Sequence, residues 1–171
     1  RLMGFGYSRM MSSLLWLRFL QHTPTKKIGP SEVSWIYRDL DAVTEIDPDF
    51  YPAYEHGGIF LSVITEDKLG AEQVLLKGTK HFPERWRIRA YLAYHYHIEM
   101  NKPELAQAQY QAGARLPGAP PLLAIRAGTM LAQSKGKEFG IEFLEKMIEE
   151  TKDAELRKRF EARLAVLKEM K

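Results

Sequence analysis

The sequence predicts an all-α fold, a right-handed helical-hairpin solenoid of about four hairpins with a capping helix at the C-terminus. Three sets of residues repeat every 35 positions and predict this class: Ile36, Ala71 and Ala106; Leu40, Leu75 and Tyr110; and Val43, Gly78 and Gly113. A proline follows each unit, at Pro48, Pro83 and Pro117. Self-similarity at a period of about 34 residues is typical of solenoids built from paired helices.

The first two expected helices lie on either side of a break rich in proline and glycine. Residues 7–21 carry apolar side chains on almost every face, which predicts a helix with more than one neighbour. Ser31 is expected to cap the next helix, because a serine side chain accepts a hydrogen bond from a free N–H of the first turn. That helix ends near Glu45, since Pro48 disfavours helix in the residue before it. Its buried face is expected to contain Val33, Ile36, Leu40 and Val43.

The remaining helices are predicted from the same apolar spacing, interrupted by turn residues. They are expected at residues 51–64 and 69–81, 84–99 and 103–115, 121–134 and 137–150, and 153–169. The last has an apolar stripe backed by charged residues, which suits a helix that closes the end of a stack. We therefore expect a single domain over residues 1–171, with hairpins at about 7–47, 51–82, 84–116 and 121–150 and a capping helix at 153–169.

Charge is spread evenly along most of the chain. The 171 residues include 25 lysines and arginines and 22 aspartates and glutamates, a net charge of +3, and the whole excess lies in residues 151–171. A protein that binds nucleic acid would show a basic stripe across several units, so we expect no nucleic acid as a partner. The sequence has no cysteine, which excludes disulfide bonds and thiolate metal ligands.

The sequence offers no catalytic or cofactor-binding motif. His95 and His97 are two positions apart, about 200° around a helix, so they point to opposite faces and cannot share a metal ion. There is no HExxH motif, phosphate-binding loop or GxGxxG sequence. We therefore expect a protein that is not an enzyme and that has no metal and no cofactor.

The repeating residues resemble those of the tetratricopeptide repeat across roughly residues 31–150. In that family the first helix carries a small residue followed three positions later by an aromatic one, and the second helix carries small, large and small residues before a proline. Two units follow this order: Gly58, Leu61, Ala71, Leu75, Gly78 and Pro83; and Ala93, Tyr96, Ala106, Tyr110, Gly113 and Pro117. The first unit departs from it at Ile36 and Val43. The fourth departs at Met147, which leaves Gly140 and Leu144 to carry the pattern.

The resemblance implies a scaffold that binds another protein or a peptide. In the family the first helix of each hairpin lines a concave groove that holds the partner. Carried onto this chain, the groove residues are Glu55, Ile59, Ser62, Arg87, Tyr94, His97, Ile125, Thr129 and Gln133. Tyrosine and arginine are enriched where interfaces carry their binding energy, so Arg87 and Tyr94 are the leading candidates.

The opening LLWLRFLQ and the later IDPDFYPAY are also similar to a group of bacterial envelope-associated repeat proteins. In that group a membrane anchor commonly precedes the repeats. The chain begins at Arg1, so we expect its start to have been removed and an anchor to lie upstream. This resemblance implies a bacterial protein held at a membrane and facing the extracytoplasmic side, with the cytoplasm as the alternative.

Two other surfaces give alternative interpretations. The helix at residues 7–21 either packs against the helix at 31–46 or serves as a self-association surface, which would make the chain a structural oligomerisation module. Two groups of basic residues either form solvated faces or bind acidic partners. The partner would be a peptide carboxylate at Arg87 and anionic lipid at the last helix. The members of the two groups are Lys77, Lys80, Arg85, Arg87 and Arg89, and Arg157, Lys158, Arg159 and Arg163.

Overall fold

The computed structural model describes residues 7–21 and 32–169, and every regular element in this part of the chain is helical. It divides the chain into two compact units, residues 1–83 with 98–100 and residues 84–97 with 101–171. The first unit contains α1 (Tyr7–Gln21), α2 (Trp35–Ile46), the π-helical turn η1 (Ala53–Gly57), α3 (Gly58–Val63) and α4 (Lys68–His81). The second contains α5 (Trp86–Tyr94), α6 (Pro103–Ala114), α7 (Pro121–Lys135), α8 (Lys137–Glu150) and α9 (Ala154–Glu169), and a second π-helical turn, η2 (His95–Glu99), follows α5.

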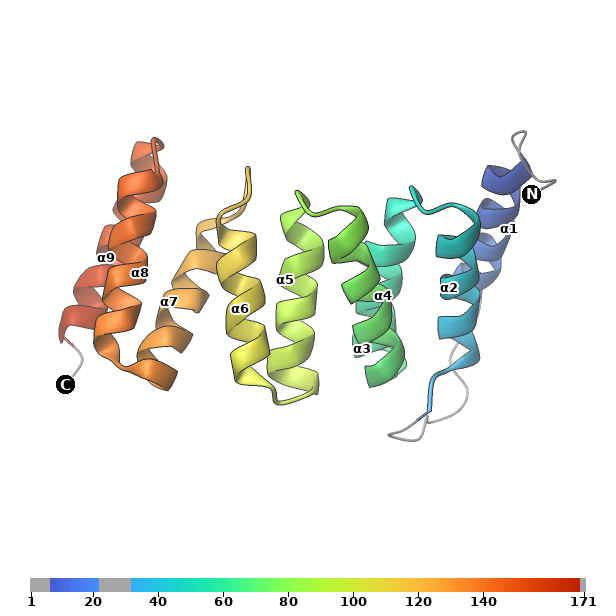
Figure 1. The fold of residues 1–171 in the computed structure, drawn as a ribbon, viewed down its shortest axis with the longest axis horizontal. Helices are drawn as coiled ribbons and strands as arrows, with labels where there is room; N and C mark the ends of the chain where they lie inside the picture. The colour runs from blue at the N-terminus through green and yellow to red at the C-terminus, as the bar shows by residue number, and fades with distance from the viewer. Residues whose placement is uncertain (1–6, 22–31, 170–171) are drawn as a thin grey trace. The chain divides into compact units, whose positions relative to one another are not determined.

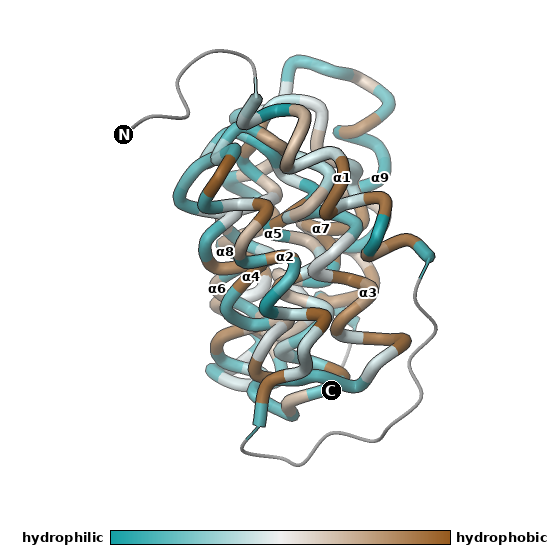
Figure 2. Tube along the Cα trace, turned by 90° about the vertical axis from the view of Figure 1, so that its right-hand side faces the viewer, coloured by the Kyte–Doolittle hydropathy of each residue, from teal (hydrophilic) through white to brown (hydrophobic). Residues whose placement is uncertain are grey.

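The helices pack as sequential antiparallel pairs, so the predicted all-α class is confirmed and the arrangement is consistent with an array of helical hairpins. Within the first unit α1 packs on α2 and α3 on α4, and within the second α5 packs on α6 and α7 on α8 (Figure 1). The last helix, α9, contacts both α7 and α8. Hydrophobic and hydrophilic residues alternate along the helices, as amphipathic packing requires (Figure 2).

The start of the second helix differs from the prediction. The helix begins at Trp35 and its N-cap is Ser34, whose side-chain oxygen accepts a hydrogen bond from the backbone N–H of Tyr37 at 2.9 Å. Ser31 lies outside the described residues. The backbone N–H of Ser34 donates to Oδ2 of buried Asp67 at 2.6 Å, and Oδ1 of that carboxylate caps α4 by accepting from the backbone N–H of Gly70. Asp67 thus joins the N-termini of α2 and α4, a connection that local cap preferences cannot reveal.

All nine residues of the three repeating sets are buried. The large members fill space beside glycines on neighbouring elements. A Cβ on Gly57 would lie 2.8 Å from Leu40, and one on Gly58 would lie 2.5 Å from Leu75. In the second unit, a Cβ on Gly128 would lie 2.9 Å from Leu144. The helices of these pairs approach so closely that no side chain fits between them at these points.

The fourth hairpin contains a small residue that the sequence analysis missed. Gly58, Ala93 and Gly128 are spaced by 35 positions, and each is fully buried or nearly so. Gly140 completes this hairpin from the second helix, because a Cβ there would lie 2.5 Å from the carbonyl oxygen of Gly128. The fourth unit therefore keeps the close approach of its helices although it lacks the final proline.

The turns between paired helices repeat with the same period. Glu66, Asn101 and Gly136 all have positive φ, at 55°, 51° and 116°. In the first two turns the next residue donates its backbone N–H six positions back, from Asp67 to Leu61 and from Lys102 to Tyr96. Asparagine and glycine tolerate this conformation, whereas glutamate pays a steric cost in it.

Replacing Gly140 with alanine tests the close approach of α7 and α8. An alanine in an exposed helix stabilises by about 1 kcal/mol relative to glycine. Here we expect the opposite sign, a loss of about 1–3 kcal/mol, because the new Cβ meets backbone that cannot move without separating the helices. Urea unfolding of Gly140→Ala measures the change, and an unchanged or increased stability would contradict the packing described.

Replacing Glu66 with glycine tests the repeated turn. We expect Glu66→Gly to stabilise the chain by about 0.5–1 kcal/mol, because glycine adopts a positive φ without the steric strain that glutamate meets there. This gain should exceed the cost of the larger backbone entropy that glycine loses on folding. The matched control is Lys146→Gly, an exposed residue inside α8, which should destabilise by about 1 kcal/mol. Thermal unfolding compares the two variants, and a loss of stability in both would show that the turn carries no strain.

Candidate functional site

The nine residues expected to line a groove are divided between the two units. Within each unit they lie on the first helix of a hairpin, or on the π-helical turn next to it. The first unit contains Glu55, Ile59 and Ser62, and the second contains Arg87, Tyr94, His97, Ile125, Thr129 and Gln133.

In the first unit, two of the three residues are buried. Glu55 is 3% exposed and Ser62 is 0% exposed, and Ile59 is half-buried. Glu55 belongs to η1, whose wider turn changes the angular spacing between residues, so regular helical periodicity assigns its face incorrectly. A partner could reach Glu55 or Ser62 only by displacing the packing around them.

On α5 two of the expected residues lie away from the core. The core face of this helix consists of Ile88, Leu92 and Ala93, all fully buried. Arg87 is exposed, and its guanidinium lies 5.3 Å from the centroid of the Trp86 ring, close enough for a cation–π contact. Tyr94 is half-buried and follows Arg87 by seven positions, two helical turns, so the two side chains share one face.

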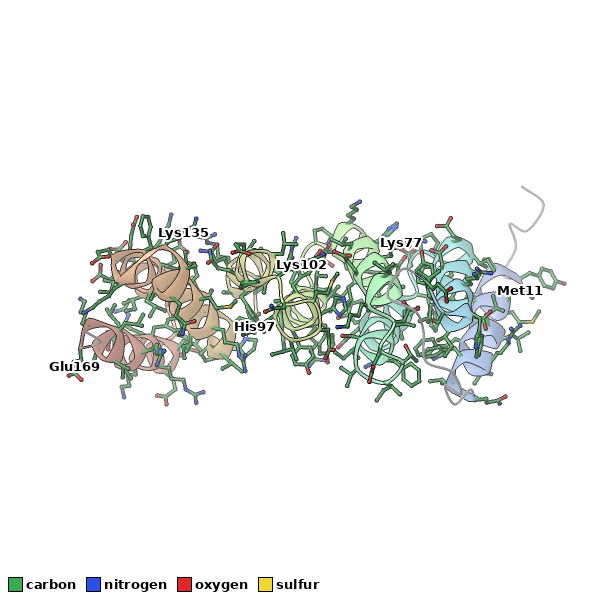
Figure 3. The ribbon with its side chains drawn as sticks, turned by 90° about the horizontal axis from the view of Figure 1, so that it is seen from below. Met11, Lys77, His97, Lys102, Lys135 and Glu169 are labelled. Carbon is green, nitrogen blue, oxygen red and sulfur yellow. The ribbon has the colours of Figure 1, made fainter. Side chains whose placement is uncertain are left out.

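The two neighbouring histidines have different surroundings. His95 is fully buried, whereas His97 is half-buried. His97 is labelled in Figure 3. The Nδ1 atom of His97 is enclosed and makes no hydrogen bond. Within residues 7–21 and 32–169, no group of three or more histidine, aspartate or glutamate side chains is placed to hold a metal ion.

On α7, the expected residue Thr129 is already engaged by the last helix. Its hydroxyl donates to the backbone carbonyl of Ile125 at 2.7 Å and accepts from the guanidinium of Arg163 on α9 at 2.9 Å. Ile125 is half-buried and Gln133 is exposed. Of the three positions on this helix, Gln133 is therefore the most accessible to a partner.

Two of the five basic residues near the middle of the chain make contacts between helices. Lys77 on α4 donates from Nζ to Asp41 Oδ1 at 3.1 Å and to Thr44 Oγ1 at 2.8 Å, and it also pairs with Glu45 (Figure 3 labels Lys77). In the second unit Arg89 donates to the side-chain oxygen of Gln109 at 3.2 Å. These two cations hold helices together, whereas the side chain of Arg87 on α5 is exposed.

The contacts of Lys77 shift the pKa values of this cluster. Burial alone would lower the pKa of Lys77, but the hydrogen bonds to Glu45 and Asp41 outweigh it, and the pKa is raised. The hydrogen bond from Lys77 lowers the pKa of Glu45. Both shifts mean that the charged forms are favoured in the folded chain, so the cluster stabilises the contact between α2 and α4.

The helix α1 has an inner and an outer apolar face. Phe19 is buried, and Trp16 stacks on it with ring centroids 4.7 Å apart; both pack into the core of the first unit. The expected packing of this helix on its neighbour is thus present, and α1 keeps a second set of apolar residues exposed. Figure 3 labels one of these, Met11, on the side of α1 away from α2. An open hollow of about 310 Å³ lies beside the first half of α1, lined by Arg9, Ser13, Asp47, Asp49, Phe50, Tyr51 and Pro52.

The fold and these surfaces define an all-helical protein whose described residues form nine α-helices packed as sequential pairs. Comparison of the chain with protein-family models, with curated proteins and with solved structures finds no significant match in any of the three. Among the described helices, none is both long enough and apolar enough to cross a membrane.

Replacing Lys77 with methionine tests the charge cluster between α2 and α4. We expect Lys77→Met to lower the melting temperature by a few degrees at pH 7, because Asp41 and Thr44 lose their shared donor. The pKa of Glu45 is lowered in the folded chain, so its ion pair stabilises the fold above the ordinary glutamate pKa, and this contribution is lost as the pH falls through the lowered value.

The difference between the wild-type chain and Lys77→Met should therefore shrink between about pH 5 and pH 3. Thermal unfolding at several pH values measures it. The control is Lys80→Met, an exposed lysine one turn further along α4, which should change the melting temperature little at any pH. A difference for Lys77→Met that stays constant down to pH 3 would show that the ion pairs contribute nothing.

Proposed function

We propose that the chain is a non-enzymatic scaffold of the tetratricopeptide-repeat type, a right-handed solenoid that binds another protein or a peptide. The 35-residue period supports the architecture, because it governs both the close helix contacts at Gly58, Ala93 and Gly128 and the turns at Glu66, Asn101 and Gly136. Repeat arrays of this kind present extended surfaces for partners.

The observation that carries the proposal is the face of α5 that contains Arg87 and Tyr94. The core of the second unit takes its contacts from the opposite side of this helix, at Ile88, Leu92 and Ala93. An arginine and a tyrosine left together on the outer face have the chemistry of an interface hot spot: the ring gives apolar area at low entropic cost, and the guanidinium gives directional hydrogen bonds.

The partner that suits this face offers a carboxylate and an apolar group. Arg87 binds the acid, from an aspartate, a glutamate or a peptide C-terminus, and Tyr94 packs on the apolar side chain. Ile125 and Gln133 on α7 are the further contact candidates in the second unit. Glu55 and Ser62 are excluded from the proposed surface because of their burial.

Affinity capture with the wild-type chain and with an Arg87→Ala, Tyr94→Ala double variant tests the proposal. We expect at least a tenfold loss of partner binding, as for the removal of two hot-spot residues. Arg87→Glu alone should also abolish binding of an acidic partner, and because Arg87 is exposed this variant separates loss of binding from loss of folding.

The matched control removes another exposed aromatic and another exposed arginine from the same unit, as Phe139→Ala with Arg157→Ala. This pair should leave partner capture unchanged. An equal loss of partner binding in both double variants, or retention of the partner by Arg87→Glu, would show that the α5 surface is not the binding site.

A further inference from the structure

The outer face of α1 is the most apolar exposed surface among the described helices. Six large side chains on this one helix are between 40% and 65% exposed: Tyr7, Met10, Met11, Leu14, Leu17 and Leu20. The opposite face is already used, since Ser12 and Phe19 are buried in the first unit. The exposed residues therefore form a second apolar face of α1, in addition to the face that packs in the core.

The charges carried by α1 itself have one sign, although Asp47 and Asp49 of the first unit line a hollow together with Arg9. The helix α1 contains no acidic residue, and residues 1–31 contain five lysines and arginines and no aspartate or glutamate. Two of these cations are on α1. Arg9 is exposed, and Arg18, whose side chain is 55% exposed, lies 3.2 Å from Asp39 through its Nε. The cations outside α1 are Arg1, Lys26 and Lys27, which lie beyond the described residues.

A second copy of the chain fits this face poorly. A stable protein–protein interface uses about 20–30 residues on each side, whereas α1 offers six exposed apolar side chains on a helix about 22 Å long. Two copies would also bring together segments that are both basic, and α1 has no carboxylate to pair with the other copy's arginines. A row of exposed apolar side chains on a helix whose own charges are all basic matches an anionic lipid surface instead.

We propose that the outer face of α1 docks on the surface of an anionic lipid bilayer. The helix lies in the plane of the interface, where its methionines and leucines enter the acyl boundary while Arg9 contacts lipid phosphates. The inner face stays packed in the first unit, so binding needs no unfolding. This surface is separate from the one on α5 and does not depend on it.

Co-sedimentation of the whole chain with vesicles tests the proposal. We expect binding to vesicles of equal parts phosphatidylcholine and phosphatidylglycerol, and much weaker binding to phosphatidylcholine alone. High salt should weaken the binding, because it screens the basic residues from the lipid. Leu14→Gln with Leu17→Gln should reduce binding about tenfold or more, since these two side chains supply apolar contact at the centre of the face. Arg9→Gln should reduce binding to the anionic vesicles several-fold.

The matched control places the same substitutions on exposed leucines of the second unit, as Leu105→Gln with Leu122→Gln. All four leucines are about half exposed, and glutamine is a good helix former, so both double variants should remain folded by circular dichroism. The control should bind vesicles as the wild-type chain does.

Three outcomes would overturn the proposal. The first is that the wild-type chain does not bind the anionic vesicles. The second is that the Leu14 and Leu17 double variant binds them unchanged, which would move the lipid contact to another surface. The third is a mass in lipid-free solution that rises with concentration and is restored to that of a monomer by the double variant, which would make a second copy the occupant.

Discussion

The fold depends on helix pairs that approach too closely to admit a side chain at the point of contact. Gly58 and Gly128 each receive a leucine from the second helix of their hairpin, and Gly140 lies directly against the backbone of α7. This geometry fixes which faces of the helices are buried, because a helix held so closely cannot rotate to present another. The packing of the core also leaves the opposite faces of α1 and α5 exposed, since Phe19 of α1 and Ile88 and Leu92 of α5 are buried.

Polar side chains add specific connections between hairpins, which apolar contact alone would not provide. In the first unit, α2 and α4 are linked at successive turns, from Ser34 and Asp67 through the hydrogen bond of Tyr37 to Gln73 to the cluster around Lys77. In the second unit, Arg163 links α9 to α7. These contacts use charges that would otherwise be free for a partner. A basic residue on a helical repeat is therefore informative about binding only after its internal contacts are known.

Periodicity predicted the helices well because apolar residues at a fixed spacing report burial directly. With the π-helical turns counted as part of the helices they adjoin, it located the nine helices of the described residues to within a few residues, and the nine residues of the three repeating sets are buried. It failed where the decisive contact is not local. Ser34 rather than Ser31 caps α2, and Ser34 also reaches Asp67 in the next hairpin. Gly128 was missed although it continues the 35-residue spacing of Gly58 and Ala93. Glu55 and Ser62 were assigned to a surface by the resemblance to a repeat family, but both side chains are buried. Arg87 and Tyr94 were placed on a shared, partly exposed face because α5 is regular there.

The sequential pairing of the helices has a consequence for how the chain folds. Each helix finds its main partner in the next segment of the chain, so most contacts require the closure of only short loops, and chains with such local contacts fold rapidly. Stability then builds up from one hairpin to the next instead of in a single event. Within the first unit, α1 packs mainly on α2, whereas α2, α3 and α4 each pack on two or more elements. We therefore expect amide hydrogens in α1 to exchange with solvent sooner than those of α2 and α4.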